Sequence, residues 1–251
     1  MSENVPIKAV DRTLAILQTL GEYDTVGVTA LAEDLDLPRS TVFNHLKTLE
    51  SGEYVVNDGG EYRLGSRFLE LGAKARDFHD VYEAARGEVS RLAEETGEIS
   101  ALLIEEHGLG VFLYRSEGEG SVHIDSFTGQ RIYLHGAALG KAILAGLPES
   151  RVDGIVQRRG LPTLTDNTVT ERDELSAELA EIAEAGVAFD DEERLDGLRS
   201  VAAPIYDGEE VLGSVSLAGP SSRVYGDRFR EEFPAKVADA ASAAELNLTY
   251  S

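Results

Sequence analysis

Two short amphipathic segments joined by a tight turn restrict what the N-terminal part of this 251-residue chain can form. The apolar spacing predicts a short helix over residues 29–35 and a second helix over residues 39–51, with the Asp-Leu-Pro connection of residues 36–38 between them. Two β-prone runs within residues 54–64 flank an Asn-Asp-Gly-Gly sequence, which favours a hairpin. Together with a helix predicted over residues 8–22, this order indicates a winged helix-turn-helix.

The helix over residues 39–51 has one apolar and one polar face. Val42, Leu46 and Leu49 are expected to be buried, with Phe43 beside them. Asn pairs bidentately with adenine, and Arg pairs with guanine or phosphate, so the opposite face suits a nucleic-acid duplex. The candidate DNA contacts are Arg39, Ser40, Thr41, Asn44 and Lys47 on this helix and Arg63 in the hairpin. In the first helix, one face is expected to hold Val10, Leu14, Leu17 and Gln18, with Ile16 and Leu20 widening it.

A heptad-like apolar repeat follows the hairpin. Its spacing predicts helices that are divided near Gly72 or near Gly87. We interpret residues 66–80 as a linker or dimer helix, and for the later part a linker helix and a helix on its own domain core are both compatible. The repeat comprises Leu64, Phe68, Leu71, Ala75, Phe78, Tyr82, Ala85, Val89 and Leu92.

The rest of the chain alternates strand-like and helix-like segments. Strands are expected over residues 99–105, 109–115, 122–127, 131–134, 187–190, 199–206 and 211–218, and helices over residues 136–145, 149–159, 171–185 and 227–246. A sheet flanked by helices that open and close the domain is an α+β arrangement. The predicted organisation is therefore a DNA-binding domain over residues 1–65, a linker helix over residues 66–80 and an α+β domain over residues 81–251.

The charge of the chain argues at first against a nucleic-acid partner. It has 23 Lys and Arg against 46 Asp and Glu, a net charge of −23, whereas phosphate binding normally requires a basic face. In molar salt the Debye length falls to about 3 Å, so an excess of carboxylates costs little self-repulsion. Only five of the cations are Lys, which favours a salt-adapted protein from a halophile over an ordinary acidic enzyme. Under that interpretation the acidity does not exclude DNA binding.

Several other classes of protein lose support. The absence of Cys excludes disulfides, thiolate metal sites and a cysteine nucleophile. No signal peptide or membrane-spanning run is recognisable, so we expect a soluble cytoplasmic protein with no membrane partner. The five His form no HxxxH or HExxH pair, and neither a GxSxG elbow nor a GxGxxG fingerprint is present. We therefore expect no catalytic residues, no metal and no cofactor. A small-molecule hydrolase and a stand-alone ligand-binding protein remain alternatives.

A candidate ligand site lies in the second half. Small residues at 136–141 open a predicted helix after a strand, so free backbone N–H groups can face a small anion, although a closely packed helix start would look the same. Asp190, Ser200 and Ser216 lie on three predicted strands and could converge on that point. We interpret the acidic run of residues 190–193 as a solvated or capping loop in preference to a cation site.

Specific motifs resemble the IclR-type transcription regulators. The DNA-binding module of that family is similar to VTALAEDLDLPRSTVFNHLKTLE at residues 28–50, followed by EYRLG at residues 61–65. Its C-terminal half is similar to LHGAALGKAILA at 134–145, GVAFDDEE at 186–193, GLRSVAAPI at 197–205 and SLAGP at 216–220. The resemblance covers roughly residues 8–247. It implies a winged-helix domain, a linker helix and a GAF-like effector domain, usually assembled as a dimer or a dimer of dimers.

The resemblance also implies roles for particular residues. The positions that contact the effector in the family correspond here to Ala138, Leu139, Asp190, Ser200 and Ser216. The family usually has Cys at the Ser200 position, and some members have a second Ser where Ala218 stands here. The implied function is a transcription regulator that binds double-stranded operator DNA and whose affinity for it is controlled by a small effector, such as a hydroxy acid or a related metabolite.

The recognition helix departs from the family pattern. The family usually has Arg and an apolar residue where this chain has Asn44 and His45, so its base contacts do not transfer directly. Residues 1–65 hold five Lys and Arg against eleven Asp and Glu, a net charge of −6. Counterion release would then contribute little to affinity, which implies a salt-tolerant mode of DNA binding.

Overall fold

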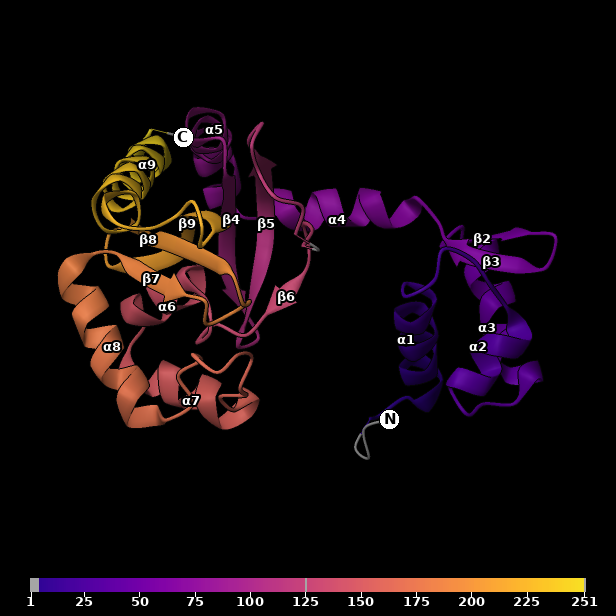
Figure 1. Cartoon of the computed structure of the whole chain (residues 1–251). Coiled ribbons are helices and arrows are strands. Elements are labelled where there is room, and N and C mark those ends of the chain that lie inside the picture. The colour runs from indigo at the N-terminus through magenta and orange to yellow at the C-terminus, as the bar shows by residue number, and fades with distance from the viewer. Residues whose placement is uncertain (1–4, 125, 251) are drawn as a thin grey trace. The chain divides into compact units, whose positions relative to one another are not determined.

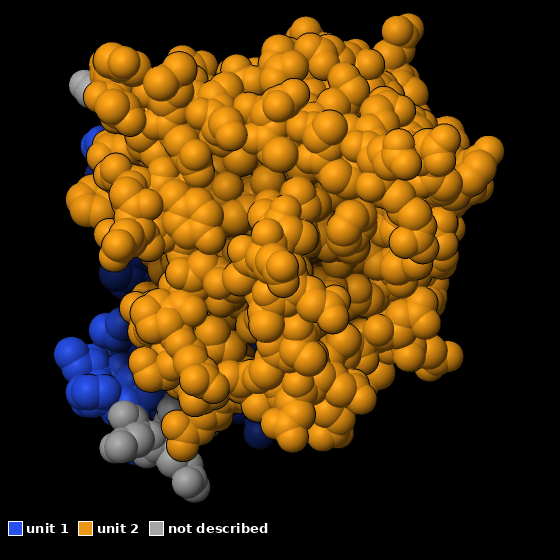
Figure 2. Space-filling view, turned by 90° about the vertical axis from the view of Figure 1, so that its left-hand side faces the viewer, with its two compact units in different colours: residues 1–75 blue, residues 76–251 orange. Residues whose placement is uncertain are grey.

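A computed structural model describes residues 5–124 and 126–250 of the chain. The described residues form two compact units, and the division falls between Ala75 and Arg76, inside the linker that the sequence predicts (Figure 2). Each unit has its own hydrophobic core.

The N-terminal unit is a winged helix-turn-helix, as predicted (Figure 1). Its three-stranded antiparallel sheet has the order β1-β3-β2, and the short strand β1 was not expected from the sequence. The β2–β3 hairpin turns at Gly59 and Gly60, both of which have positive φ angles, as a two-residue hairpin loop requires. The elements are α1 (Lys8–Leu20), β1 (Val26–Gly27), α2 (Val28–Asp34), α3 (Arg39–Ser51), β2 (Val55–Asp58) and β3 (Glu61–Leu64).

The core of this unit contains Ile16 and Leu20 of α1 and the predicted Val42, Leu46 and Leu49 of α3. Two expectations about its faces are wrong. Val10 and Leu14 of α1 are 50% and 54% exposed, and Phe43 of α3 is 44% exposed. Helix α1 has apolar residues on two faces, and the helical period alone does not tell which of them meets α2 and α3.

The heptad-like repeat forms two helices, α4 (Arg67–Asp77) and α5 (Asp80–Thr96). They are divided at Phe78 and His79, where the backbone of His79 is extended, and not at Gly72 or Gly87 as we expected, because each glycine lies within a helix. None of the residues of α4 is buried. The later part of the repeat is a core helix, since Tyr82, Ala85, Val89 and Leu92 are buried in the C-terminal unit.

The C-terminal unit is built on a six-stranded antiparallel sheet with the order β6-β5-β4-β9-β8-β7. The strands are β4 (Ile99–Glu106), β5 (Leu109–Glu117), β6 (Arg131–Ile132), β7 (Ala188–Asp191), β8 (Leu198–Asp207) and β9 (Glu210–Pro220). The helices that follow α5 are α6 (Ala138–Gly146), α7 (Glu149–Arg159), α8 (Arg172–Ala185) and α9 (Phe233–Thr249), with a short π-helical segment at Arg228–Glu232. The strand expected over residues 122–127 is wrong for residues 122–124 and 126–127, which have no regular structure, and residue 125 lies outside the described residues.

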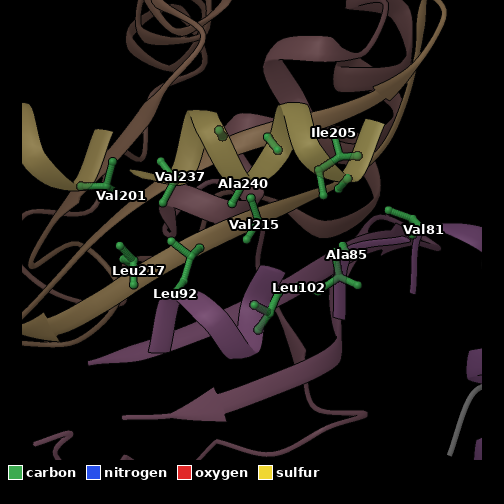
Figure 3. Packing of buried hydrophobic residues seen from close by; sticks show 14 of the residues in the cluster. Val81, Ala85, Leu92, Leu102, Val201, Ile205, Val215, Leu217, Val237 and Ala240 are labelled. Atoms are coloured by element: carbon green, nitrogen blue, oxygen red, sulfur yellow. The ribbon is translucent and has the colours of Figure 1, made fainter. Parts of the chain in front are cut away.

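Helices cover both faces of this sheet (Figure 1). Helices α5 and α9 pack on the face formed by Leu102, Val201, Val215 and neighbouring apolar residues, as Figure 3 shows. Helix α6 packs on the opposite face, and α8 packs against α6 in the same apolar cluster. Because successive side chains of a strand alternate between faces, Ser200, Ser214 and Ser216 all lie on the α6 side. The α+β class is confirmed, and hydroxyl groups are concentrated under the start of α6.

The start of α6 depends on a close approach that only glycine permits. A Cβ atom on Gly140 would lie 2.1 Å from the carbonyl oxygen of Leu134, whereas a Cβ atom on Gly154 in α7 would meet nothing within 4 Å. We predict that Gly140→Ala lowers the free energy of unfolding by about 1–3 kcal/mol, because backbone atoms have to move. Gly154→Ala should raise it by up to about 1 kcal/mol, because alanine favours the helix. Urea unfolding followed by circular dichroism measures both, and equal effects of the two changes would contradict this account.

Candidate functional sites

The polar face of α3 is open to solvent. Arg39, Ser40, Asn44 and Lys47 are exposed and Thr41 is half-buried, while Val42 and Leu46 on the opposite side are fully buried. Arg63 is exposed on β3, the central strand of the small sheet. The structure therefore places all six candidate DNA contacts where a ligand can reach them, five on one helix and one on the hairpin.

Two cations of this face already have acidic neighbours. Arg39 lies 3.6 Å from Glu33, and Lys47 lies 2.8 Å from Glu50. The hydrogen bond from Lys47 to Glu50 raises the pKa of Lys47, which keeps it protonated at neutral pH. Exposed ion pairs of this kind contribute little to stability and exchange partners readily, so phosphate groups can replace the carboxylates.

Asn44 and His45 are neighbours in the chain, but their side chains have different environments. The Nδ1 atom of His45 lies 2.8 Å from the hydroxyl oxygen of Thr13, so a hydrogen bond ties His45 to α1. The Asn44 side chain is exposed, and its backbone carbonyl accepts a hydrogen bond from the Thr48 hydroxyl. Of these two residues, only Asn44 is exposed to solvent, whereas His45 is half-buried.

The second candidate site is a small cavity in the C-terminal unit, with a volume of about 30 Å³. It brings together four of the five predicted effector residues: Leu139, Asp190, Ser200 and Ser216. Ala138 is not in its lining, although the adjacent Ala137 is. Its apolar wall includes Ile99, Ala101, Phe112, Ile132 and Leu198.

Asp190 is a buried carboxylate that accepts several hydrogen bonds at this cavity. It is 1% exposed, and one carboxylate oxygen accepts hydrogen bonds from the backbone N–H of Glu193 at 2.8 Å and of Arg194 at 3.4 Å. The hydroxyl of Ser200 donates to the other oxygen at 3.1 Å. Burial raises the pKa of Asp190, and these hydrogen bonds oppose that shift. The expectation of a capping loop is correct for Asp190, but Asp190 and Glu193 are buried and not solvated.

Sequence reasoning missed two arginines that line the same cavity. Arg115 is in β5, and Arg194 follows the acidic run. The signal was present in the sequence, because Arg194 directly follows a run whose first member, Asp190, was already assigned to the site. Nothing in the sequence indicated that Arg115, which lies 79 positions earlier, would reach the same place.

A buried charge cluster adjoins the cavity. The ammonium group of Lys141 is fully buried and bonds to Glu178 of α8 at 2.5 Å and to Glu193 at 2.6 Å. Burial raises the pKa of Glu193 to about 7, and the nearby Lys141 opposes that shift. The hydroxyls of Thr165 and Thr168 donate to the backbone carbonyl of Glu193. The cluster therefore fixes the loop that carries Arg194 to α6 and α8.

A larger surface groove of about 560 Å³ lies elsewhere on the C-terminal unit. It is lined by Glu105, Glu209 and Glu210, and its Arg151 is already paired with Glu105 at 2.9 Å. Such a groove repels anions, and none of the predicted effector residues lines it. The smaller cavity is therefore the better candidate for an anionic effector.

Both halves of the chain match known protein families. Residues 9–59 match the IclR helix-turn-helix domain, and residues 73–245 match the family description "Bacterial transcriptional regulator IclR C-terminal". The chain belongs to the IclR family. It is thus a transcriptional regulator with an N-terminal DNA-binding helix-turn-helix and a C-terminal ligand-binding domain.

Relatives within the IclR family agree with this assignment. The probable HTH-type transcriptional regulator ArcR of Halobacterium salinarum is 34% identical, over 96% of this chain and 94% of its own length. The regulator XynR of Escherichia coli is 32% identical, over 87% of this chain and 88% of its own length. These relatives are regulators and not enzymes.

Solved structures show the same fold. The IclR protein of Thermotoga maritima superposes with a TM-score of 0.82 at 26% identity, covering 97% of this chain and 99% of that chain. An IclR homologue from Microbacterium hydrocarbonoxydans, solved with 4-hydroxybenzoate, has a TM-score of 0.84 at 21% identity, covering 97% of this chain and all of that chain.

Two features are absent from residues 5–124 and 126–250. None of the helices in these ranges is long and apolar enough to cross a membrane. The same residues contain no group of three or more His, Asp and Glu side chains placed to hold a metal ion.

The Lys141 cluster predicts a pH dependence of stability. Because the pKa of Glu193 is raised to about 7 in the folded state, the folded protein holds this proton more tightly than the unfolded chain does. The contribution of this bound proton to the free energy of unfolding is complete below about pH 4.5 and is lost as the pH rises through 7. Between pH 5 and 8, the wild type should therefore lose about 2–3 kcal/mol of its free energy of unfolding relative to Glu193→Gln.

Urea unfolding at constant salt measures this difference. Glu181→Gln, at an exposed position of α8, is the matched control and should show the same pH profile as the wild type. Parallel profiles for the wild type and Glu193→Gln would contradict the assignment.

Proposed function

We propose that this regulator binds double-stranded operator DNA with α3 and the β2–β3 hairpin, and that a small effector in the cavity of the C-terminal unit controls its affinity for the operator. The observation that best supports this proposal is the exposed polar face of α3, which lies opposite the fully buried Val42 and Leu46. A recognition helix inserts such a face into the major groove while its apolar side packs on the preceding helix.

The residues of α3 have different proposed roles. Asn44 reads a base, because its exposed amide offers the donor and acceptor that adenine requires. Arg39 and Lys47 contact phosphates, for which they leave their weak pairs with Glu33 and Glu50. Ser40, Thr41 and Arg63 add backbone contacts that fix the register of the helix on the duplex.

The acidity of the chain suggests the ionic conditions of this binding. The net charge of −6 over residues 1–65 disfavours approach to DNA at low salt, because long-range repulsion is then unscreened. We propose that the protein works at molar salt in the cytoplasm of a halophile. The Halobacterium salinarum relative and the low Lys content support this proposal.

The effector is proposed to be a small acid that carries a hydroxyl group. The cavity offers hydroxyls at Ser200 and Ser216 and an acceptor at Asp190. Ligand binding changes DNA affinity only if the ligand prefers one of two arrangements of the protein, with a coupling of typically about 1–3 kcal/mol. We propose that residues 66–80, which lead from the hairpin into the C-terminal unit, adopt a different position in each of these two arrangements.

The recognition helix is tested at Asn44. We expect Asn44→Ala to cost about 1–3 kcal/mol of operator binding and to relax specificity at a single base pair. Footprinting and titration in molar KCl, on DNA next to the protein's own gene, measure this effect. Lys47→Ala is the control, since loss of a phosphate contact should weaken binding to all sequences alike. Wild-type affinity and selectivity in Asn44→Ala would refute the assignment.

Helix α4 is proposed to pair two copies of the chain as a dimer or a dimer of dimers. Leu71 of α4 and Phe78, which directly follows α4, are 45% and 85% exposed, so both present apolar surface to solvent. Phe68 differs from them, because the centre of its ring lies 5.2 Å from the centre of the Tyr54 ring. This contact anchors α4 to the residue that directly precedes β2. Leu71 is therefore a cleaner probe of pairing than Phe68.

Pairing is tested by Leu71→Glu. The added carboxylate would be buried in the seam between two chains, so we expect a smaller assembly and a shorter or weaker operator footprint. Light scattering and footprinting measure the two results, and Lys74→Gln, at an exposed position of α4, makes the same change of one negative unit in net charge without adding a carboxylate to this apolar surface. An unchanged assembly size in Leu71→Glu would show that this apolar surface does not pair two copies of the chain.

A further inference from the structure

Helix α3 presents an aromatic ring to solvent. Phe43 is 44% exposed, although its neighbours Val42 and Leu46 are fully buried. Among the residues that the structure describes, the apolar core cluster of the N-terminal unit does not include it. A single exposed apolar residue is ordinary on a protein surface, so the exposure alone assigns no role to this ring. A role follows from where the ring lies on α3.

Phe43 shares one side of α3 with proposed DNA contacts. Side chains three and four residues apart lie on the same side of a helix, and Ser40, Arg39 and Lys47 have these spacings from Phe43. The ammonium group of Lys47 lies 5.8 Å from the centre of the Phe43 ring. Asn44, the proposed base-reading residue, is next in the chain. The ring is thus in the N-terminal half of α3, the part of a recognition helix that contacts base edges.

The chemistry of the ring restricts what it can contact on DNA. A phenyl ring has no hydrogen-bond donor or acceptor for a phosphate or for a polar base edge. In the major groove, the apolar group that a base presents is the C5 methyl of thymine, and phenylalanine is one of the side chains suited to contact it. Cytosine lacks this methyl group. A contact of this kind therefore distinguishes thymine from cytosine.

The charge of the N-terminal unit gives an apolar contact a particular value. Residues 1–65 have a net charge of −6, so few cations are available to neutralise phosphates. Phosphate contacts release counterions and weaken steeply as the salt concentration rises. Burial of apolar surface releases no counterions, and it depends on the area removed from water. An apolar base contact thus persists at salt concentrations that weaken the contacts of Arg39 and Lys47 with phosphates.

We propose that the ring of Phe43 packs against the C5 methyl group of a thymine in the operator and selects thymine at that base pair. This inference rests on the proposed function and adds a second base-reading residue to Asn44. The two side chains recognise different features of a base edge, because Asn44 offers hydrogen bonds and Phe43 offers an apolar surface.

Thymine replacement in the operator tests the inference. Footprinting of the full-length protein in molar KCl locates the operator, and each thymine in it is then replaced in turn by deoxyuridine, which removes only the methyl group. At one thymine we expect the wild type to bind about 3–5-fold more weakly, the effect of exposing one methyl-sized apolar group. Phe43→Ala should bind the unmodified operator more weakly by at least this factor and should not respond to deoxyuridine at that thymine.

Two further variants control for loss of an aromatic ring and for size. Phe127→Ala removes the same kind of ring from an exposed position of the C-terminal unit and should keep the wild-type response to deoxyuridine. Phe43→Leu retains an apolar side chain and should keep part of that response. Circular dichroism of Phe43→Ala should match the wild type, because the ring lies outside the core cluster.

Salt dependence separates a base contact from a role in orienting Lys47. Loss of a phosphate contact in Lys47→Ala should reduce the slope of log affinity against log salt by about one, and the response to deoxyuridine should remain. Phe43→Ala should show the reverse, with an unchanged slope and no response. A reduced slope in Phe43→Ala together with a wild-type response to deoxyuridine would assign the ring to orienting Lys47 and overturn the inference.

The remaining outcomes distinguish this inference from the proposed function. A wild type that binds every deoxyuridine-substituted operator as tightly as the unmodified one overturns the methyl contact, and this result needs no variant. Persistence of the response in Phe43→Ala overturns the assignment to Phe43. The absence of any operator footprint overturns the proposed function itself, and this inference with it.

Discussion

The six-stranded sheet of the C-terminal unit has to bury both of its faces, and the position of the small cavity follows from how it does so. On the face toward α5 and α9, the strands supply branched apolar residues such as Val201, Val215 and Leu217, which fill the layer. On the opposite face, the alternate positions of β8 and β9 carry serines. Small side chains leave space under the start of α6, and the arginines from β5 and from the loop after β7 reach into it.

Polar groups next to this space are organised by a single loop. Asp190, Glu193 and Arg194 lie within five residues, yet the first caps the loop, the second bonds to Lys141 and the third faces the cavity. Arg194 is therefore adjacent in the chain to Glu193, a member of the buried cluster that holds α6 and α8. Buried clusters of this kind have few alternative arrangements, because an unpaired charge in them is costly. They are suited to convert a small local shift into a change between discrete states.

The N-terminal unit solves a different problem, the recognition of a polyanion by an acidic protein. Its cations are few, and two of those on α3 are held by weak pairs with exposed carboxylates. High salt screens the repulsion between the acidic surface and DNA over distances beyond a few ångströms, whereas contacts at hydrogen-bond distance persist. Recognition in such a protein depends more on base-edge and shape complementarity than on counterion release.

The sequence by itself determined the order of the domains, the winged helix-turn-helix, the α+β class and the family, because these depend on local periodicity, turn residues and short motifs. It also assigned Leu139, Asp190, Ser200 and Ser216 to a common place, which they share around one cavity. The tertiary structure alone decided which of two apolar faces of α1 is buried, where the heptad repeat breaks, and that Arg115 and Arg194 line the same cavity. The physical reason is that a helix with two apolar faces, or a strand with an isolated arginine, is locally consistent with several environments. Only packing against residues distant in the chain selects one of them.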